Sequence, residues 1–150
     1  MTPEVLAPTF KFSHPIRVRQ GETDAQGRVL CPMFCVYREA ARTEYFRNLK
    51  FSYPEQWKSN FHHVMTIGSC HNEKRQAHFD DELLIFAKIS AIQKTNFTFS
   101  FEIYQKAGGQ LISKATSTHA VIDPKKWAII RVPDFFREIV SQFENQKFMI

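Results

Sequence analysis

The stretch that decides the fold is VRQGETDAQGRVLCPMFCVYREAARTEYFRNL, residues 18–49. The stretch begins at the end of a segment in which apolar and polar residues alternate. A polar turn bounded by Gly21 and Gly27 follows, and after it the apolar residues have the spacing of a helix. Apolar residues recur there at spacings of three or four, which predicts an amphipathic helix from Pro32 to about Leu49. Those apolar residues are Phe34, Tyr37, Ala41, Tyr45 and Leu49.

Three segments around this stretch have the pattern of strands. Residues 9–20 alternate between apolar and polar side chains, which predicts a half-buried strand leading into the turn. Residues 63–75 are irregular but strand-like. Leu83–Ile92 is apolar on nearly both sides, which is typical of a central strand.

The second half of the chain predicts a hairpin and a closing helix. Residues 97–104 alternate, Gly108-Gly109 makes a turn, and residues 111–122 return, as in a long antiparallel hairpin. Residues 134–144 place their apolar side chains on one helical face, and residues 54–61 have room for a further short helix.

Together these elements predict an α+β protein with one domain over residues 1–150, a length that suits a single core. An antiparallel sheet of about five strands would wrap around one long helix. One layer of helix leaves part of such a sheet uncovered, so we expect a homo-oligomer, either a dimer or a dimer of dimers.

The amino-acid composition limits the kinds of molecule that the protein is expected to bind. The net charge of +5 would suit nucleic acid, a membrane surface or a phosphorylated ligand. The basic residues are scattered instead of forming an arm, so we expect neither nucleic acid nor a membrane as a partner. The 15 phenylalanines suit a core, an apolar pocket or a subunit interface equally well.

The cysteines and the apolar runs bear on location. Three cysteines form no paired framework, which favours a reducing compartment. The first residues lack a basic head followed by an apolar run, and no segment approaches the roughly 20 apolar residues of a membrane span. We therefore expect a cytoplasmic protein.

Several kinds of site are missing from the sequence. It has no Gly-rich phosphate loop, no dinucleotide fingerprint and no Gly-x-Ser-x-Gly motif. The six histidines form no helical metal pair, and Cys31 and Cys35 have no second pair to complete a zinc set. The sequence therefore predicts no cofactor and no metal.

Asp24 lies in the polar turn, just before the predicted helix. The first helical amides, near Cys31, Pro32 and Met33, are expected to be free and partly positive. Asp24 is then either a turn aspartate, or a hydrolytic residue that attacks a carbonyl carbon or activates water while the amides polarise the oxygen. An ordinary aspartate pKa of ~3.9 makes a weak base, so an activated acyl group such as a thioester is the fitting substrate.

At this point the chain resembles a known family. Residues 18–49 are similar to the signature of the 4-hydroxybenzoyl-CoA thioesterase family of the hotdog fold, with a D-x-D-x-x-G-like turn before a Tyr-x-x-aromatic-x-Glu-x-Ala-Arg helix. Asp80-Asp81-Glu82-Leu83 resembles the family's Gly-Asp-Glu-Leu, and Arg131-Val132-Pro133 resembles its closing Arg-x-Pro. The likeness spans about residues 10–140 in the expected order.

The resemblance implies an acyl-CoA thioesterase that releases a fatty or aromatic acid and CoA. It also implies dimers whose sheets join edge to edge, with active sites at the dimer interface. Asp24 matches the catalytic carboxylate, and Cys31 matches the residue whose backbone N–H polarises the thioester carbonyl. The residues expected to bind substrate are Gly27, Pro32, Met33 and Phe34, with Lys94 and Arg131 near the CoA phosphates.

Three residues depart from the family pattern. Glu22 replaces the first aspartate of the turn, Cys31 replaces a Tyr or His, and Met33 replaces an Asn. The backbone N–H of Cys31 does not depend on the side chain, so it can still polarise the thioester carbonyl. The Cys31 thiol is either a passive group or a nucleophile, because helix N-termini lower the pKa of a thiol. Alternatives are a non-catalytic hotdog protein that binds acyl-CoA or acyl carrier, and a dehydratase, which no histidine near the turn supports.

Overall fold

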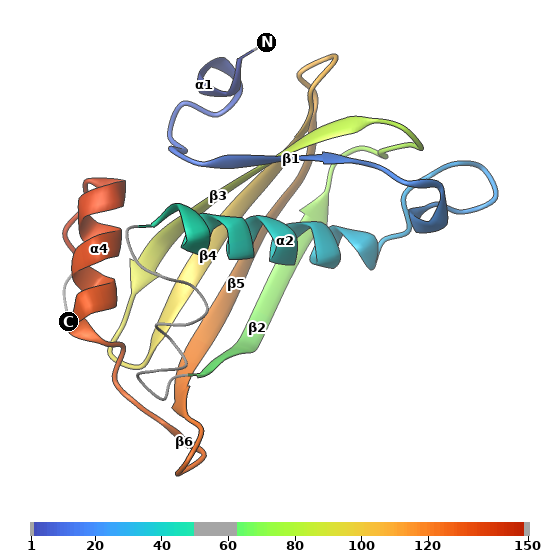
Figure 1. Cartoon of the computed structure of the whole chain (residues 1–150). Coiled ribbons are helices and arrows are strands. Elements are labelled where there is room, and N and C mark those ends of the chain that lie inside the picture. Colours follow the sequence, from blue (N-terminus) through green and yellow to red (C-terminus); the bar gives the residue numbers. More distant parts are fainter. Residues whose placement is uncertain (1, 50–62, 149–150) are drawn as a thin grey trace. The chain divides into compact units, whose positions relative to one another are not determined.

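The computed structural model describes residues 2–49 and 63–148. Its main elements follow the predicted order of strand, long helix, four strands and terminal helix (Figure 1). The helices are α1 (Pro3–Leu6), the 3-10 turn η1 (Gln20–Glu22), α2 (Met33–Asn48) and α4 (Asp134–Glu144), and the strands are β1 (Ser13–Arg17), β2 (His63–Glu73), β3 (Glu82–Ile92), β4 (Asn96–Gln105), β5 (Leu111–Asp123) and β6 (Ala128–Ile129). The helix expected over residues 54–61 lies outside the described residues.

The strands pair in the order β1-β3-β4-β5-β2, and β6 adds two residues beside β5. The five long strands match the prediction, and β6 is an addition to it. β3 has a partner on each side, as predicted for the central strand Leu83–Ile92, and β4 is the middle strand of the order. β1 and β2 end the order.

β1 is shorter than the predicted strand over residues 9–20. Its ladder with β3 runs from Ser13 opposite Phe86 to Arg17 opposite Glu82. One further bond at each end, to the carbonyls of Phe12 and Asp81, extends the pairing slightly. The chain then turns into η1, which ends the strand.

Two compact units are built from interleaved segments of the chain. The first comprises Met1–Tyr45, His71–Lys88 and Phe101–Ala115. Its core holds the predicted stripe of α2, since Phe34, Tyr37, Ala41 and Tyr45 are all buried. The ring of Tyr45 meets that of Phe12 edge to face, with centroids 5.6 Å apart.

The second unit comprises Phe46–Cys70, Ile89–Ser100 and Thr116–Ile150, and its core is aromatic. Phe46 of α2 packs against Phe99 at 5.6 Å and against Phe136 of α4 at 6.0 Å between ring centroids. Phe97 joins this cluster, 5.1 Å from Phe136. Among the described residues eight phenylalanines are buried, so many of these rings fill the core.

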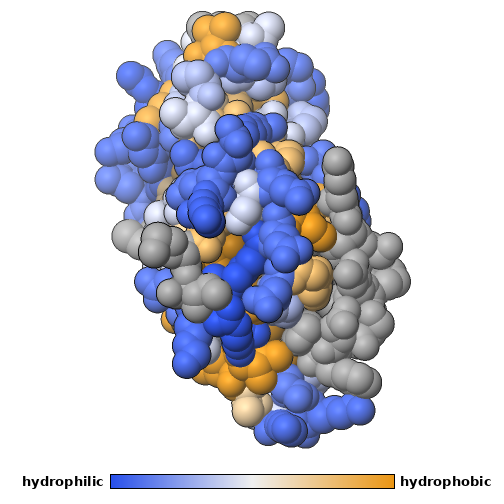
Figure 2. Space-filling model, turned by 90° about the vertical axis from the view of Figure 1, so that its left-hand side faces the viewer, coloured by the Kyte–Doolittle hydropathy of each residue, from blue (hydrophilic) through white to orange (hydrophobic). Residues whose placement is uncertain are grey.

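The surface and the helices of the structure bear on the predictions about nucleic-acid and membrane partners. Figure 2 shows a face on which hydrophilic side chains cover most of the described surface, with apolar side chains in separate smaller patches. None of the described helices is long and apolar enough to cross a membrane. The single domain over residues 1–150 stays a prediction.

Candidate active site

Asp24 lies in a tight turn that holds both of its carboxylate oxygens. Oδ1 accepts hydrogen bonds from the backbone N–H groups of Gln26 and Arg28, both at 2.9 Å. Oδ2 accepts one from Arg28 Nε at 3.0 Å. Gly27 closes the turn with a φ of +76°, a left-handed conformation that favours glycine.

These bonds set the charge of Asp24. The backbone N–H of Arg28, with help from that of Gln26 and from the Arg28 guanidinium, holds the pKa of the Asp24 carboxyl below its ordinary value. Asp24 is therefore ionised at neutral pH. It is a half-exposed carboxylate with a fixed orientation, and the carboxylate is a weaker base than in free aspartate.

Glu22 ties the turn to α2. The buried carboxylate accepts bonds from Arg19 N at 2.8 Å, from the Arg19 guanidinium, and from the Tyr37 hydroxyl at 3.0 Å. Burial alone would raise the pKa of Glu22, but these donors hold it below its ordinary value. Burial and the bond to Glu22 also raise the pKa of Tyr37. Sequence reasoning treated Glu22 only as a mild change of motif and missed this anchoring role.

The start of α2 offers fewer free donors than expected. Met33 N–H donates to the carbonyl of Leu30 at 2.9 Å, because the chain tightens into i→i+3 bonds there. Pro32 has no N–H to offer. Within the described part of the chain the Cys31 N–H donates to no group, so the three-residue ring of amides reduces to this one donor.

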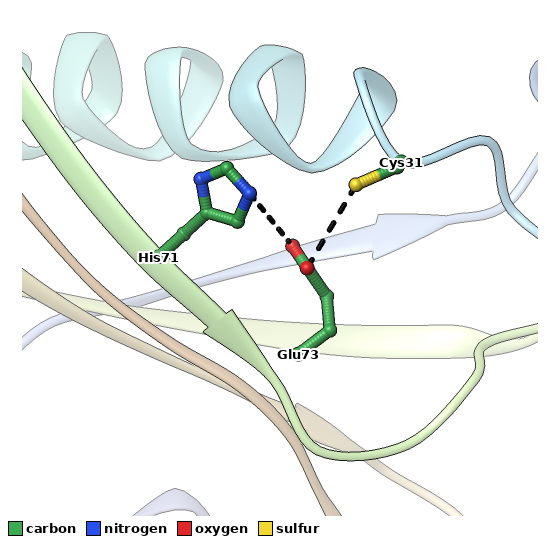
Figure 3. A group of neighbouring side chains, drawn as sticks. All are labelled: Cys31, His71 and Glu73. Atoms are coloured by element: carbon green, nitrogen blue, oxygen red, sulfur yellow. Dashed lines mark hydrogen bonds and ion pairs between the residues drawn. The ribbon is translucent and has the colours of Figure 1, made fainter.

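The Cys31 thiol belongs to a small polar cluster on the same unit (Figure 3). Its Sγ lies 3.7 Å from Glu73 Oε2, and Glu73 Oε1 lies 3.6 Å from His71 Nε2. Partial burial, followed by the negative charge of Glu73, raises the pKa of the Cys31 thiol. The lowered thiol pKa expected at a helix N-terminus is therefore wrong, because desolvation of the thiol and then the Glu73 carboxylate both raise its pKa.

This cluster was missed by sequence reasoning. His71 and Glu73 are two residues apart on β2, so their side chains share one face of the strand. That spacing was the available signal, but Cys31 is 42 residues from Glu73, and only the fold brings them together.

Two further predicted residues follow in α2. Met33, the first residue of the helix, is half-buried. The Phe34 side chain is 4% exposed and meets the Tyr37 ring at 6.0 Å, so it packs in the core of the first unit.

Lys94 and Arg131 are brought together in the second unit. Lys94 lies in the turn between β3 and β4, and its carbonyl accepts a bond from Val132 N at 2.8 Å. The Lys94 side chain is exposed, whereas Arg131 is half-buried and pairs with Asp134 at 3.2 Å. Arg137 of α4 lies beside them and donates to the carbonyl of Gln93.

The hydrogen bonds of His119 give this residue a structural role. His119 is buried, with Ser117 Oγ at 2.7 Å from Nε2 and Thr66 Oγ1 at 3.1 Å from Nδ1, so both ring nitrogens are satisfied.

A hollow of about 290 Å³ in the second unit is lined by Leu49, Ile139 and Phe143, together with Asn48 and Gln142. No predicted site residue lines that hollow.

Comparison with known proteins places this chain among its relatives. Residues 18–140 match the family model of the thioesterase-like superfamily. The chain therefore belongs to that superfamily, as the residues around Asp24 suggested.

Two similar proteins have names that describe an activity. A putative acyl-CoA thioesterase, YneP of Bacillus subtilis, is 27% identical over 88% of this chain and 94% of its own length. The acyl-CoA thioesterase YbgC of Haemophilus influenzae is 29% identical over 91% of this chain and 96% of its own length.

Solved structures support the fold. The crystal structure of a DHNA-CoA thioesterase from Staphylococcus aureus matches with a TM-score of 0.80, covering 89% of this chain and 90% of that one. The identity is 18%, so this likeness concerns the fold alone. The predicted α+β hotdog fold is confirmed.

Proposed function

We propose that this chain hydrolyses acyl-CoA thioesters to a free acid and CoA. The observation that carries the proposal is the segment from Asp24 to Met33. It holds an ionised carboxylate at Asp24 and, at Cys31, a backbone N–H that donates to no group in the described part of the chain. The membership of the thioesterase-like superfamily and the names of YneP and YbgC support the same reaction.

In the proposed reaction the Cys31 N–H donates to the thioester carbonyl oxygen, where negative charge develops. The Asp24 carboxylate either attacks the carbonyl carbon or takes a proton from the attacking water. If Asp24 attacks, the carbon–sulfur bond breaks as the acyl group forms an anhydride with the Asp24 carboxylate, and water then hydrolyses this anhydride to the free acid and restores Asp24. If Asp24 activates water, the water oxygen bonds to the carbonyl carbon, the carbon–sulfur bond breaks and the free acid leaves. In both cases the thiolate of CoA takes up a proton. A carboxylate with a lowered pKa is a weak base, which suits an activated thioester better than an amide or an ordinary ester.

We assign the binding of the CoA phosphates to Lys94 and Arg131. The backbone bond from Val132 N to the Lys94 carbonyl, which makes the Lys94 and Arg131 segments neighbours, supports this assignment. Arg131 is partly neutralised by Asp134, so Lys94 is the freer of the two charges. Gly27, Pro32 and Met33 would contact the thioester from the turn and the helix start.

We also propose that the protein is a homo-oligomer joined through β2. This strand ends the sheet order, runs for 11 residues and leaves residues 66–69 exposed, with Ile67 at 51%. No described strand pairs with the outer edge of β2, and an unpaired edge of that length is a template for another strand. The opposite edge is poorer, because β1 has five residues and includes Pro15, which has no N–H to donate.

A cytoplasmic location is part of the proposal. Cys31 and Cys35 are both free and exposed thiols, which a reducing compartment would preserve.

The alternative that the test must exclude is a non-catalytic acyl-CoA-binding protein, in which Asp24 and its bond to Arg28 at 3.0 Å would only hold the turn in shape.

The test is a hydrolysis screen over short, medium, long and aromatic acyl-CoAs, with thiol release as the readout and a metal chelator in the buffer. The proposal predicts turnover of at least one class well above the blank with heat-denatured protein. Saturable binding of acyl-CoA without any thiol release would support the binding protein instead.

A further inference from the structure

We propose that Cys31, His71 and Glu73 form a binding site for a divalent transition-metal ion of the zinc class. Among the described residues these three offer a sulfur, an imidazole nitrogen and a carboxylate oxygen within 4.8 Å of one another. The proposal concerns metal binding only and does not depend on the thioesterase reaction.

The ligands come from two elements of the same unit (Figure 3). Cys31 stands just before α2, and His71 and Glu73 lie two residues apart on β2, so both β2 side chains point to one face. The carboxylate lies between the other two groups. This arrangement holds three donors around one point without using any residue of the aromatic core.

The distances suit a tetrahedral ion. Zinc bonds of about 2.3 Å to sulfur and about 2.0–2.2 Å to nitrogen or oxygen put neighbouring ligand atoms about 3.4–3.6 Å apart. The Cys31 Sγ to Glu73 Oε2 distance is 3.7 Å, and the His71 Nε2 to Glu73 Oε1 distance is 3.6 Å. These two distances end on different oxygens of Glu73, and the three ligand atoms lie within 4.8 Å of one another. Side-chain rotations that draw them in to about 3.4–3.6 Å would complete the coordination.

One carboxylate oxygen lacks an adequate partner in the described part of the chain. Glu73 Oε1 is buried and accepts no hydrogen bond, since the His71 nitrogen is too far away at 3.6 Å. An unsatisfied buried carboxylate oxygen is costly. A cation bound between Cys31 and His71 would satisfy it.

The sulfur, nitrogen and oxygen ligand atoms determine which metal ion the site prefers. Thiolate and imidazole favour zinc and its transition-metal neighbours, whereas Mg²⁺ and Ca²⁺ prefer oxygen ligands alone. Binding would displace the Cys31 thiol proton to the solvent and form a metal–sulfur bond. Three protein ligands leave a fourth position of the tetrahedron for water or another small ligand.

The test is metal binding by the purified, tag-free chain after treatment with a chelator. Zn²⁺ affinity is measured by competition with a chromophoric chelator, and Co²⁺ is used as a spectroscopic probe of the ligands. We expect one ion per chain, a thiolate-to-cobalt charge-transfer band, intense d–d bands of a tetrahedral ion, and no competition by Mg²⁺.

Variants locate the site. Cys31→Ser, His71→Ala and Glu73→Gln should each weaken Zn²⁺ binding by at least ~10-fold, and Cys31→Ser should also abolish the charge-transfer band. Cys35→Ser and His78→Ala are matched controls, since both side chains are exposed and lie outside the cluster, and they should bind as the native chain does. Circular dichroism checks that each variant is folded.

Two results would overturn the proposal. One is the absence of Zn²⁺ binding at micromolar concentration in the folded native chain. The other is binding that survives Cys31→Ser, or that is lost in the Cys35→Ser control.

Discussion

The half-exposed side chain of Asp24 is held in one orientation by its hydrogen bonds. Three donors from Gln26 and Arg28 fix its carboxylate, and they also lower its pKa. A fixed orientation suits a group that must meet one carbonyl carbon, because reactants held in the right geometry need less activation entropy. The Arg28 side chain is the adjustable part of this arrangement, since the backbone donors do not depend on side-chain identity.

Arg28→Met should therefore shift the pH dependence of the proposed hydrolysis. The main donor, the Arg28 backbone N–H, remains, but loss of the guanidinium should raise the Asp24 pKa part of the way back. Activity requires the ionised carboxylate, so the acid limb of the kcat/KM profile should move to higher pH. Arg75→Met, which removes an exposed arginine outside the turn, is the control. An acid limb that stays in place or moves to lower pH would count against Asp24 as the titrating group.

At the scale of elements, Glu22 links the turn, η1 and α2. The buried Glu22 carboxylate accepts from Arg19 through its backbone N–H and its exposed guanidinium, and from the hydroxyl of the buried Tyr37. These bonds fix where the Asp24 turn stands relative to the first turn of α2 within one unit. The geometry of the proposed site thus depends on a residue that need not touch substrate.

Glu22→Gln should destabilise the fold by about 1–3 kcal/mol, because the Arg19 bonds lose their charge and a buried group loses a partner. Urea unfolding at neutral pH would measure this. The Glu22 pKa is lowered in the folded state, so its stabilisation is present at neutral pH and is lost as the pH falls through the folded pKa. The difference from the native chain should accordingly shrink in acid.

Glu102→Gln is the matched control for that prediction. Glu102 also accepts from a tyrosine hydroxyl, that of Tyr104 at 2.7 Å, but it has no guanidinium partner among the described residues. Its loss of stability should be the smaller of the two. An equal or larger loss in Glu102→Gln would show that the Arg19 bonds add nothing.

Lys94 and Arg131 belong to the connections before β4 and α4. Lys94→Ala and Arg131→Ala should each raise KM for acyl-CoA by up to about fivefold, the equivalent of about 1 kcal/mol for an exposed charge, with kcat little changed. Inhibition by free CoA should weaken as salt rises, because the phosphates are attracted by charge. Lys114→Ala removes an exposed lysine of β5 and should have no effect. Salt-insensitive inhibition would contradict the assignment.

At the scale of the whole molecule, the periodic parts of the sequence predicted the fold well. The stripe of Phe34, Tyr37, Ala41 and Tyr45 is buried as expected, because side chains three or four apart share a helix face. Strand order was harder to predict. Periodicity shows that Leu83–Ile92 is buried on both faces, but it does not say which strand lies in the middle.

The candidate site was only partly predictable for the same reason. Asp24 and Cys31 are close in sequence, so local motifs indicated both. The bonds of Glu22 to Tyr37 and of Cys31 to Glu73 join positions 15 and 42 residues apart, and no local pattern reports such contacts. The pairing of Arg28 with Asp24 was local but depended on the exact backbone of the turn.

Self-association is the prediction that concerns the assembly. Sedimentation at micromolar concentration should show a dimer or a larger oligomer, since β2 leaves an edge unpaired in the sheet order. Ile67→Lys places a charge on that edge and should shift the population towards monomer. Val5→Lys, which alters an exposed apolar residue of α1, should not. A native chain that sediments as a monomer would contradict the proposal.

The central claim is that Asp24 performs the chemistry of thioester hydrolysis, and the kcat/KM of Asp24→Asn tests it most directly. On the best substrate of the acyl-CoA screen, with a chelator present, kcat/KM should fall by at least ~10²-fold, the scale of losing a general base. The affinity for CoA and the circular dichroism spectrum should stay as in the native chain. The contradicting result is an Asp24→Asn variant within an order of magnitude of native activity beside an inactive Cys31→Ala, which keeps the backbone donor and removes only the thiol.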